Sequence, residues 1–284
     1  MSNRNPTWLA LVAALAVGCG GDAGDGAADG GGEDAAQADA DPAVDPAVAA
    51  TVSGTVTFTG TAPEPTSIDM SEEPVCAEKH TEPPTFQPVQ AADGNLANVF
   101  VFVSEGLGDE VAMPSAEPTT LDQNGCRYRP HVLGIQVGEN LVIRNSDDVL
   151  HNINTESTAN RPFNISQPQA GMETARSFST PEVMIPVKCD VHGWMSAFIG
   201  VTGHGHHAVT GEDGSFTIEG LPPGDYVIEA WHETLGAQTM NVSVGEAETG
   251  TADFTYDSDT AYDPVPMGEP LIVGHDAHAE HGAG

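Results

Sequence analysis

Basic residues are scarce in this chain. Its 284 residues include 8 Lys and Arg against 42 Asp and Glu, which gives a formal net charge of −34 at pH 7. Phosphate binding needs clustered cations, so we expect no nucleic acid among the partners. A strongly acidic surface favours encounter with a basic patch on another protein. Solubility or adaptation to saline surroundings explains the same charge, and both interpretations stay open.

Long hydrophobic runs and the common catalytic signatures are also missing. The apolar stretch from Trp8 to Val17 is too short to cross a bilayer as a helix. The sequence contains no phosphate-binding glycine loop, no nucleophile elbow and no pattern of paired catalytic carboxylates. We therefore do not expect an enzyme.

The N-terminal residues have the features of an export signal. Arg4 precedes the apolar stretch and small residues follow it, so residues 1–18 are interpreted as a signal peptide. The sequence AVGC that ends at Cys19 resembles a bacterial lipobox. This resemblance implies a lipoprotein that is acylated at Cys19 and anchored at the periplasmic or outer face of a bacterial membrane. An ordinary cleaved signal, which would leave a soluble periplasmic protein, is the alternative.

Both ends of the remaining chain are predicted to be solvated. Residues 19–50 are rich in Gly, Ala and Asp and contain no basic or aromatic residue, so they cannot bury enough apolar area to offset their ordering entropy. We expect a disordered acidic linker there. Residues 258–284 are expected to be a disordered tail. They contain three histidines whose spacing allows loose chelation: His275, His278 and His281.

Two short stretches carry the residues that point to a metal. The stretch CDVHGWM places Cys189, His192 and Met195 at the spacing C-x2-H-x2-M, and His151 lies in the earlier stretch NSDDVLHN. Two imidazoles and a thiolate, with a weak thioether, are the ligand set of a trigonal blue-copper centre. Zinc is the chemical competitor, because Cys and His also suit zinc. The thioether favours copper.

The stretches NSDDVLHN and VKCDVHGWM resemble the cupredoxins of the plastocyanin and amicyanin group. The resemblance implies a Greek-key β-sandwich with one type 1 copper ion. The family's copper ligands correspond to four residues of this chain: His151, Cys189, His192 and Met195. Asn152 matches the asparagine that ties the two ligand loops together in the family. Two positions depart from the pattern, since Val187 replaces a frequent aromatic residue and Gly193 a frequent proline.

The same resemblance implies a function. We expect an exported one-electron carrier whose redox partner, such as a cytochrome or a membrane oxidase, presents a basic patch. Four protein ligands would leave no open position for a substrate, which argues against an oxidase or a nitrite reductase. Two alternatives stay open: a periplasmic copper carrier or sensor without electron transfer, and a non-redox cell-surface binding module that keeps the sandwich shape.

Two further cysteines remain once Cys19 is assigned to the lipid and Cys189 to the metal. Because an exported chain permits disulfides, Cys76 and Cys126 are expected to pair with each other. The alternative is a second metal site formed by Cys76 and His80, which lie four residues apart.

Apolar periodicity predicts an almost wholly β chain. Thr51–Gly60 alternates apolar and polar residues, and Asn98–Val103 is apolar on both faces. Further strands are expected at Val132–Val137, Leu141–Arg144, Thr174–Ser179, Val183–Lys188 and Ser196–Val201. Residues 62–92, rich in Pro, Glu and Thr, are expected to form a long loop.

A second β-sandwich is predicted after the copper motif. The stretch GEDGSFTIEGLPPGDYVIEAWHETLG resembles the carboxypeptidase regulatory-like domain, whose fold is an Ig-like or transthyretin-like β-sandwich. We therefore divide the chain into a cupredoxin-like domain at residues 51–203 and this module at residues 204–257. The module has only about four strands of its own, fewer than the seven usual in such a sandwich. In an alternative assignment, residues 51–105 complete it.

Three more histidines follow the last strand of the predicted copper domain. His204, His206 and His207 offer three imidazoles within four residues, which is enough to bind a metal. In an extended chain, however, alternation would split these side chains between opposite faces. The sequence leaves open whether they form a second metal site.

Overall fold

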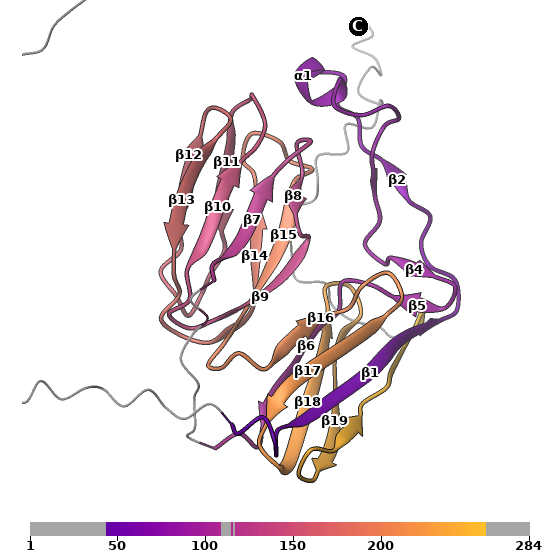
Figure 1. Cartoon of the computed structure of the whole chain (residues 1–284). Coiled ribbons are helices and arrows are strands. Elements are labelled where there is room, and N and C mark those ends of the chain that lie inside the picture. The colour runs from indigo at the N-terminus through magenta and orange to yellow at the C-terminus, as the bar shows by residue number, and fades with distance from the viewer. Residues whose placement is uncertain (1–43, 109–114, 116, 260–284) are drawn as a thin grey trace, which may run out of the picture. The chain divides into compact units, whose positions relative to one another are not determined.

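The computed structural model describes residues 44–108, 115 and 117–259. Cys19, the predicted signal peptide, most of the predicted linker and the tail histidines lie outside these residues. The described residues form strands β1–β21 and one short helix, α1 (Pro74–Ala77), so the fold is all-β as predicted (Figure 1). No described helix has the length and apolar character needed to cross a membrane.

Strands β7 to β15 form one sandwich, here called the inserted sandwich. Its four-stranded sheet has the order β13 (Met172–Arg176), β10 (Leu141–Asn145), β7 (Thr119–Gln123) and β8 (Tyr128–Arg129). Its five-stranded sheet has the order β12 (Asn164–Gln167), β11 (His151–Thr155), β14 (Glu182–Lys188), β15 (Ser196–Thr202) and β9 (Val132–Gln136). The pairs β7–β10 and β9–β15 are parallel and the others antiparallel, in the Greek-key arrangement expected of a cupredoxin.

Aliphatic side chains from both sheets make the core of the inserted sandwich. Leu121 and Ile143 come from the four-stranded sheet and Ile185 and Ile199 from the five-stranded sheet, and all four are fully buried. Full burial of such a side chain contributes ~1.5–3 kcal/mol relative to exposure. A core of this kind gives a rigid frame from which the loops at its ends project.

The remaining main strands form a second sandwich, here called the host sandwich. One sheet has the order β17 (Ser215–Leu221), β1 (Ala50–Thr59), β5 (Asn95–Leu96) and β4 (Ala91–Ala92), and β20 (Thr249–Thr251) and β21 (Phe254–Asp257) also pair with β1. The other has the order β16 (His207–Val209), β6 (Phe100–Glu105), β18 (Gly224–His232) and β19 (Gly236–Val244). The chain therefore starts the host sandwich with β1 and β6, builds the inserted sandwich, and then returns to complete the host.

Strand β1 illustrates how the sequence pattern produces a strand. Val52, Val56 and Phe58 alternate along the chain and are buried on one face, as the period of two requires. Gly54 lies on the same face of the strand as these residues, but the neighbouring backbone approaches it closely. A Cβ atom at Gly54 would lie 1.9 Å from the carbonyl oxygen of Ala252, so only glycine fits there.

The excursion between β1 and β6 is more structured than the loop expected at residues 62–92. It contains α1 and a short antiparallel pair, β2 (Thr66–Ser67) with β3 (Thr85–Phe86). Cys76 in α1 forms a disulfide with Cys126, with an S–S distance of 2.03 Å. Because Cys126 lies between β7 and β8, the disulfide ties the excursion to the inserted sandwich.

Candidate metal centre

Strand register brings the two predicted ligand stretches to the same end of the inserted sandwich. Strands β14 and β15 form a hairpin in which Lys188 pairs with Ser196, so residues 189–195 are its connecting loop. Strand β11 pairs with β14 at Asn154 and Lys188, and His151 is the first residue of β11. Continued in the antiparallel direction, this register places His151 level with the loop.

The loop folds around the Cys189 thiol. The Cys189 N–H donates to the Met195 carbonyl at 3.2 Å, and the Met195 N–H donates to the His192 carbonyl at 2.9 Å. The His192 N–H points at the Cys189 sulfur, at 3.4 Å. Met195 is fully buried and belongs to the same core cluster as Cys189. These contacts fix a tight turn that directs the thiol and the His192 ring to one side.

Three ligand atoms converge there. The Nδ1 atoms of His151 and His192 are 2.9 Å apart, and the Cys189 sulfur lies 3.9 Å from the His192 Nδ1. The ligand atoms of all three residues lie within 4.8 Å of one another. Both imidazoles are completely buried, and the Cys189 side chain is nearly so. The structure thus brings together one thiol and two imidazoles from segments that are far apart in the sequence.

Asn152 connects the two ligand stretches. Its side-chain oxygen accepts hydrogen bonds from the Asp190 N–H at 2.7 Å and from the Cys189 thiol at 3.3 Å. Its side-chain nitrogen donates to Asp190 and Asn164 at 3.0 and 2.8 Å. The asparagine that follows the first histidine therefore holds the start of the cysteine loop in place.

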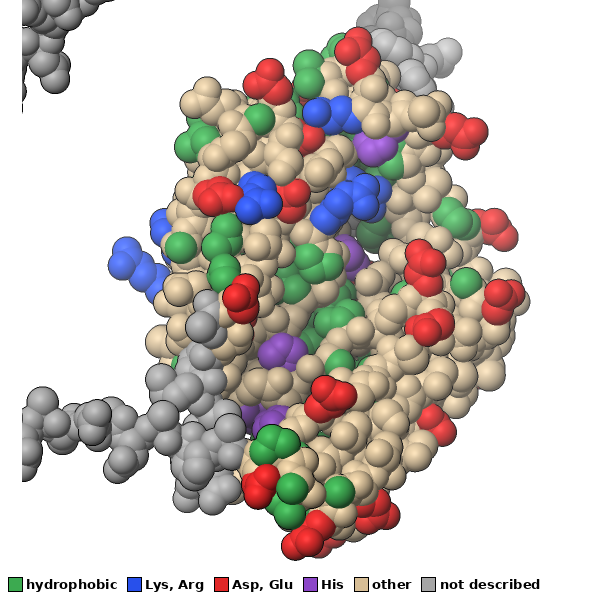
Figure 2. Space-filling model, viewed as in Figure 1, with side chains coloured by type: hydrophobic (Ala, Val, Ile, Leu, Met, Phe, Trp, Pro, Cys, Tyr) green, Lys and Arg blue, Asp and Glu red, His purple; other side chains and the backbone are tan. Residues whose placement is uncertain are grey.

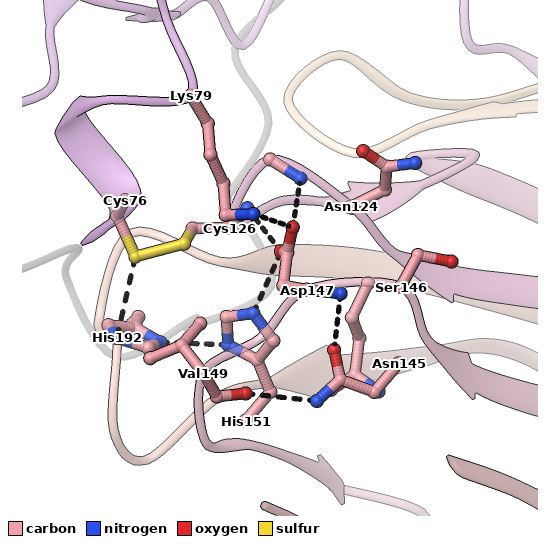
Figure 3. Close-up of polar contacts among 12 residues, drawn as sticks. Cys76, Lys79, Asn124, Cys126, Asn145, Ser146, Asp147, Val149, His151 and His192 are labelled. Atoms are coloured by element: carbon pink, nitrogen blue, oxygen red, sulfur yellow. Dashed lines mark hydrogen bonds and ion pairs between the residues drawn. A yellow bond between two sulfur atoms is a disulfide. The ribbon is translucent and has the colours of Figure 1, made fainter. Parts of the chain in front are cut away.

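Asp147 is a functional neighbour that the sequence analysis missed. Its carboxylate accepts from the His151 Nε2 at 2.9 Å and forms an ion pair with Lys79 at 3.0 Å (Figure 3). It also accepts from the backbone N–H groups of Gly125 and Cys126. Burial favours the neutral acid, but these donors hold the pKa of Asp147 well below its usual range. The spacing of four between Asp147 and His151 was the available signal.

The hydrogen bonds around the thiol and the first imidazole shift their pKa values in opposite directions. Burial raises the pKa of the Cys189 thiol, but hydrogen bonds to both histidine rings and to backbone amides outweigh burial and lower this pKa to about 6. Burial lowers the pKa of His151, whereas Asp147 and Cys189 raise it, and the net shift is upward. Cys189 is therefore poised as a thiolate, the form that binds metals.

This arrangement fits a soft metal cation. The His151 Nε2 hydrogen is committed to Asp147, so the lone pair of its Nδ1 faces His192 and Cys189. When both Nδ1 atoms are unprotonated, a cation among them and the thiolate would offset the mutual repulsion of these donors in the buried site. The donor set of two His and one Cys, with Met195 in the same loop, suits copper.

The disulfide and a tryptophan lie against the second imidazole. The Cys76 sulfur is 3.8 Å from the Nε2 of His192 (Figure 3). The Trp194 indole N–H donates to the Cys126 carbonyl at 3.0 Å, and its ring lies 5.1 Å from that of His192. Because Cys76 is in a disulfide, it supplies no thiolate to a site with His80, whose Nε2 contacts the Gly125 carbonyl instead.

The histidines after β15 are occupied by other contacts. The His204 Nε2 donates to the Val103 carbonyl at 2.9 Å, and the His206 Nδ1 contacts the Glu219 carbonyl at 3.3 Å. The His207 Nδ1 lies 3.3 Å from the Thr202 hydroxyl. Within the described ranges, the possible metal-binding groups comprise His151 with Cys189 and His192, and a group containing the disulfide-bonded Cys126. His204, His206 and His207 belong to neither group.

Comparisons with known proteins find one family model and several solved structures that are similar to this chain. Residues 196–257 match the family model of the carboxypeptidase regulatory-like domain, which confirms the resemblance predicted for the C-terminal strands. The chain is similar to a copper-containing nitrite reductase from Thermus scotoductus, with 18% identity, 52% of this chain covered and a TM-score of 0.29. It spans only 28% of that enzyme.

Smaller copper proteins are also similar in structure. One is a reduced Cu(I) mutant form of amicyanin, with 16% identity, 31% of this chain and 85% of that chain covered, and a TM-score of 0.28. Another is a purple cupredoxin from Nitrosopumilus maritimus, with 21% identity, 30% and 99% coverage, and a TM-score of 0.26. A comparison with curated proteins finds no match.

Proposed function

We propose that this protein is a one-electron carrier that binds a single type 1 copper ion through His151, Cys189, His192 and Met195. One observation carries the proposal: two imidazole Nδ1 atoms and a thiol of lowered pKa lie together in a buried cluster. When bound, copper supplies a redox centre that cycles between Cu(I) and Cu(II).

The residues around the cluster support this role by holding the donors and excluding water. Asp147 fixes the His151 ring through its outer nitrogen, and Asn152 holds the start of the cysteine loop through the Asp190 N–H. Such outer contacts orient ligands, and a hydrophobic surrounding sets the redox potential. Four protein ligands leave no position for a substrate, so we propose a carrier and not an enzyme.

The visible spectrum and metal content of the purified protein test this proposal. We expect an intense thiolate-to-copper absorption, one copper per chain and reversible reduction. Cys189→Ser should abolish the absorption, while His206→Ala, which changes a histidine outside the cluster, should leave it intact. A colourless protein that binds zinc in preference to copper would contradict the proposal. Copper that is bound but redox-inactive and readily lost to a chelator would favour a periplasmic carrier or sensor.

We also propose that the redox partner presents a basic patch. All described Lys and Arg residues belong to residues 79–188, so the charged groups on β16–β21, apart from histidine, are acidic. On the face seen in Figure 2, Lys and Arg side chains gather over the inserted sandwich, whereas Asp and Glu side chains are scattered over both sandwiches. Electron transfer to a basic cytochrome should slow as salt screens the attraction. A rate that does not change with salt would exclude steering.

Export and lipid anchoring complete the proposed function. The lipobox-like sequence that ends at Cys19 supports an anchor at the periplasmic or outer face of a bacterial membrane. In bacterial cells supplied with a labelled fatty acid, the wild-type chain should be labelled and Cys19→Ala should not. A wild-type chain that takes up no label would leave the ordinary cleaved signal as the better interpretation.

A further inference from the structure

One segment of the excursion contacts the outer nitrogen of His192 directly and is linked to that of His151 through Asp147. The disulfide sulfur of Cys76 lies 3.8 Å from the Nε2 of His192. Three residues later, Lys79 forms an ion pair with Asp147, whose carboxylate accepts from the Nε2 of His151. Figure 3 shows α1 and the Lys79 side chain above the two rings. Residues 74–80, with the disulfide, are here called the cap.

The cap is not part of the sheets that hold the ligands. It lies between β2 and β3, in the excursion that separates β1 from β6. Helix α1 has four residues, and Glu73, the N-cap residue before it, makes no side-chain capping hydrogen bond. A helix this short does not hold its place by its own hydrogen bonds. Its position therefore depends on the disulfide and on the few contacts that the cap makes with the inserted sandwich.

Those contacts include the turn that carries Cys126. The His80 Nε2 is 2.8 Å from the Gly125 carbonyl, so the end of the cap is attached to the same turn as Cys126. Below the cap, both imidazoles have no exposed surface. By contrast, Val191 and Leu150, which precede the two histidines in the sequence, are 43% and 41% exposed. The chain around the rings thus reaches solvent while the rings themselves do not.

We propose that the cap positions both imidazole ligands and seals the copper centre, so that a closed Cys76–Cys126 disulfide limits the exchange of copper. This inference rests on the proposed function. Water or a chelator that approaches His192 from its outer nitrogen meets the disulfide, and the approach to His151 meets Asp147 and Lys79. Copper would leave only after a ligand ring turns away, and the disulfide sulfur 3.8 Å from the His192 Nε2 opposes a turn of that ring.

The rate at which a copper(I) chelator removes the metal tests the cap. Full-length protein is loaded with copper, reduced with ascorbate and mixed with excess bathocuproine disulfonate. Outer contacts of metal ligands contribute about 10- to 100-fold to metal affinity, so the double variant Cys76→Ala/Cys126→Ala should lose copper about 10- to 100-fold faster. Glu64→Ala, which changes an exposed residue of the excursion outside the cap, should leave the rate unchanged.

Two more variants separate sealing from general stability. Lys79→Met keeps the disulfide but removes the ion pair, so it should accelerate copper loss to a smaller degree and shift the reduction potential. It also tests the cap if the double variant does not fold. Gly54→Ala destabilises the host sandwich far from the cap and should not accelerate copper loss in the folded protein.

The outcomes distinguish the cap from the function on which it rests. Equal rates of copper loss from the wild-type chain, the double variant and Lys79→Met would contradict the proposed role of the cap. They would not contradict the proposed copper centre. Equal acceleration of copper loss by Gly54→Ala and Lys79→Met would also contradict the role of the cap, because lower overall stability would then explain the effect. A wild-type chain that takes up no copper overturns the proposed function, and the cap with it.

Discussion

Replacing Asp147 by alanine should weaken both the fold and the metal centre. The Asp147 side chain is 2% exposed and accepts four hydrogen bonds, from His151, Lys79 and two backbone N–H groups. Its loss leaves the His151 N–H and both backbone donors buried without this acceptor. Breaking a buried charge pair from one side costs about 3–5 kcal/mol, and we expect a loss of unfolding free energy in this range.

The copper site should respond in parallel. Without the carboxylate, nothing fixes the His151 ring with its Nδ1 toward Cys189, and lost outer contacts of this kind lower metal affinity by about 10- to 100-fold. Urea unfolding of the metal-free chain measures the first effect, and a competition titration with a copper chelator measures the second. Asp147→Asn, which keeps one accepting oxygen, should lie between alanine and the wild type.

A matched control is available at the next residue. Asp148 is exposed, so Asp148→Ala should change the unfolding free energy by less than about 0.5 kcal/mol, as surface substitutions usually do. The reasoning fails if Asp147→Ala and Asp148→Ala have the same unfolding free energy. It also fails if Asp147→Ala is unstable yet binds copper as tightly as the wild type, since the carboxylate would then have no effect on the ligand.

Three further predictions concern parts of the fold away from the ligands. Gly54→Ala should cost about 1–3 kcal/mol in urea unfolding, because the added Cβ meets the Ala252 carbonyl. Tyr256→Phe should cost about 1–3 kcal/mol, because the buried hydroxyl donates to two carbonyls, one at 2.7 Å; an unchanged midpoint would contradict this. Hydrogen bonds from residues 157–160 lower the pKa of Glu182 to about 2 against the opposing effect of burial. Because this folded-state pKa is depressed, the carboxylate stabilises the fold above its unfolded pKa, near 4.5, and this stability is lost as pH falls toward 2. Glu182→Gln should therefore be destabilised at pH 7 and should approach the wild type near pH 2.

The ligand stretches were accessible from sequence because their information is local. Cys189, His192 and Met195 occupy one loop, and the apolar runs on either side of it predict the hairpin that presents them. His151 is remote, but a histidine followed by an asparagine at a strand start is a recognisable context. The all-β fold was predictable for the same reason, since alternation along each strand is visible without knowledge of its partners.

The surroundings of the ligands could not be predicted in this way. The donors to Asp147 come from residues 79, 125, 126 and 151, and only the last is close to it in sequence. The Pro-, Glu- and Thr-rich excursion has no periodicity that places α1 over His192. Pairing across the whole chain, such as Val52 with Ile218, likewise follows from tertiary packing and not from local pattern.

The insertion of one sandwich into the chain of the other affects how the protein unfolds on heating. Strands β6 and β16 pair at Phe102 and His207, and the inserted sandwich fills the interval between them. If that interval melted while the host stayed intact, a flexible loop of about 100 residues would have to be closed, at an entropic cost of about 4 kcal/mol. A ligand that raises the melting temperature of the insert therefore also protects the host, and calorimetry should record the pair as one shared transition.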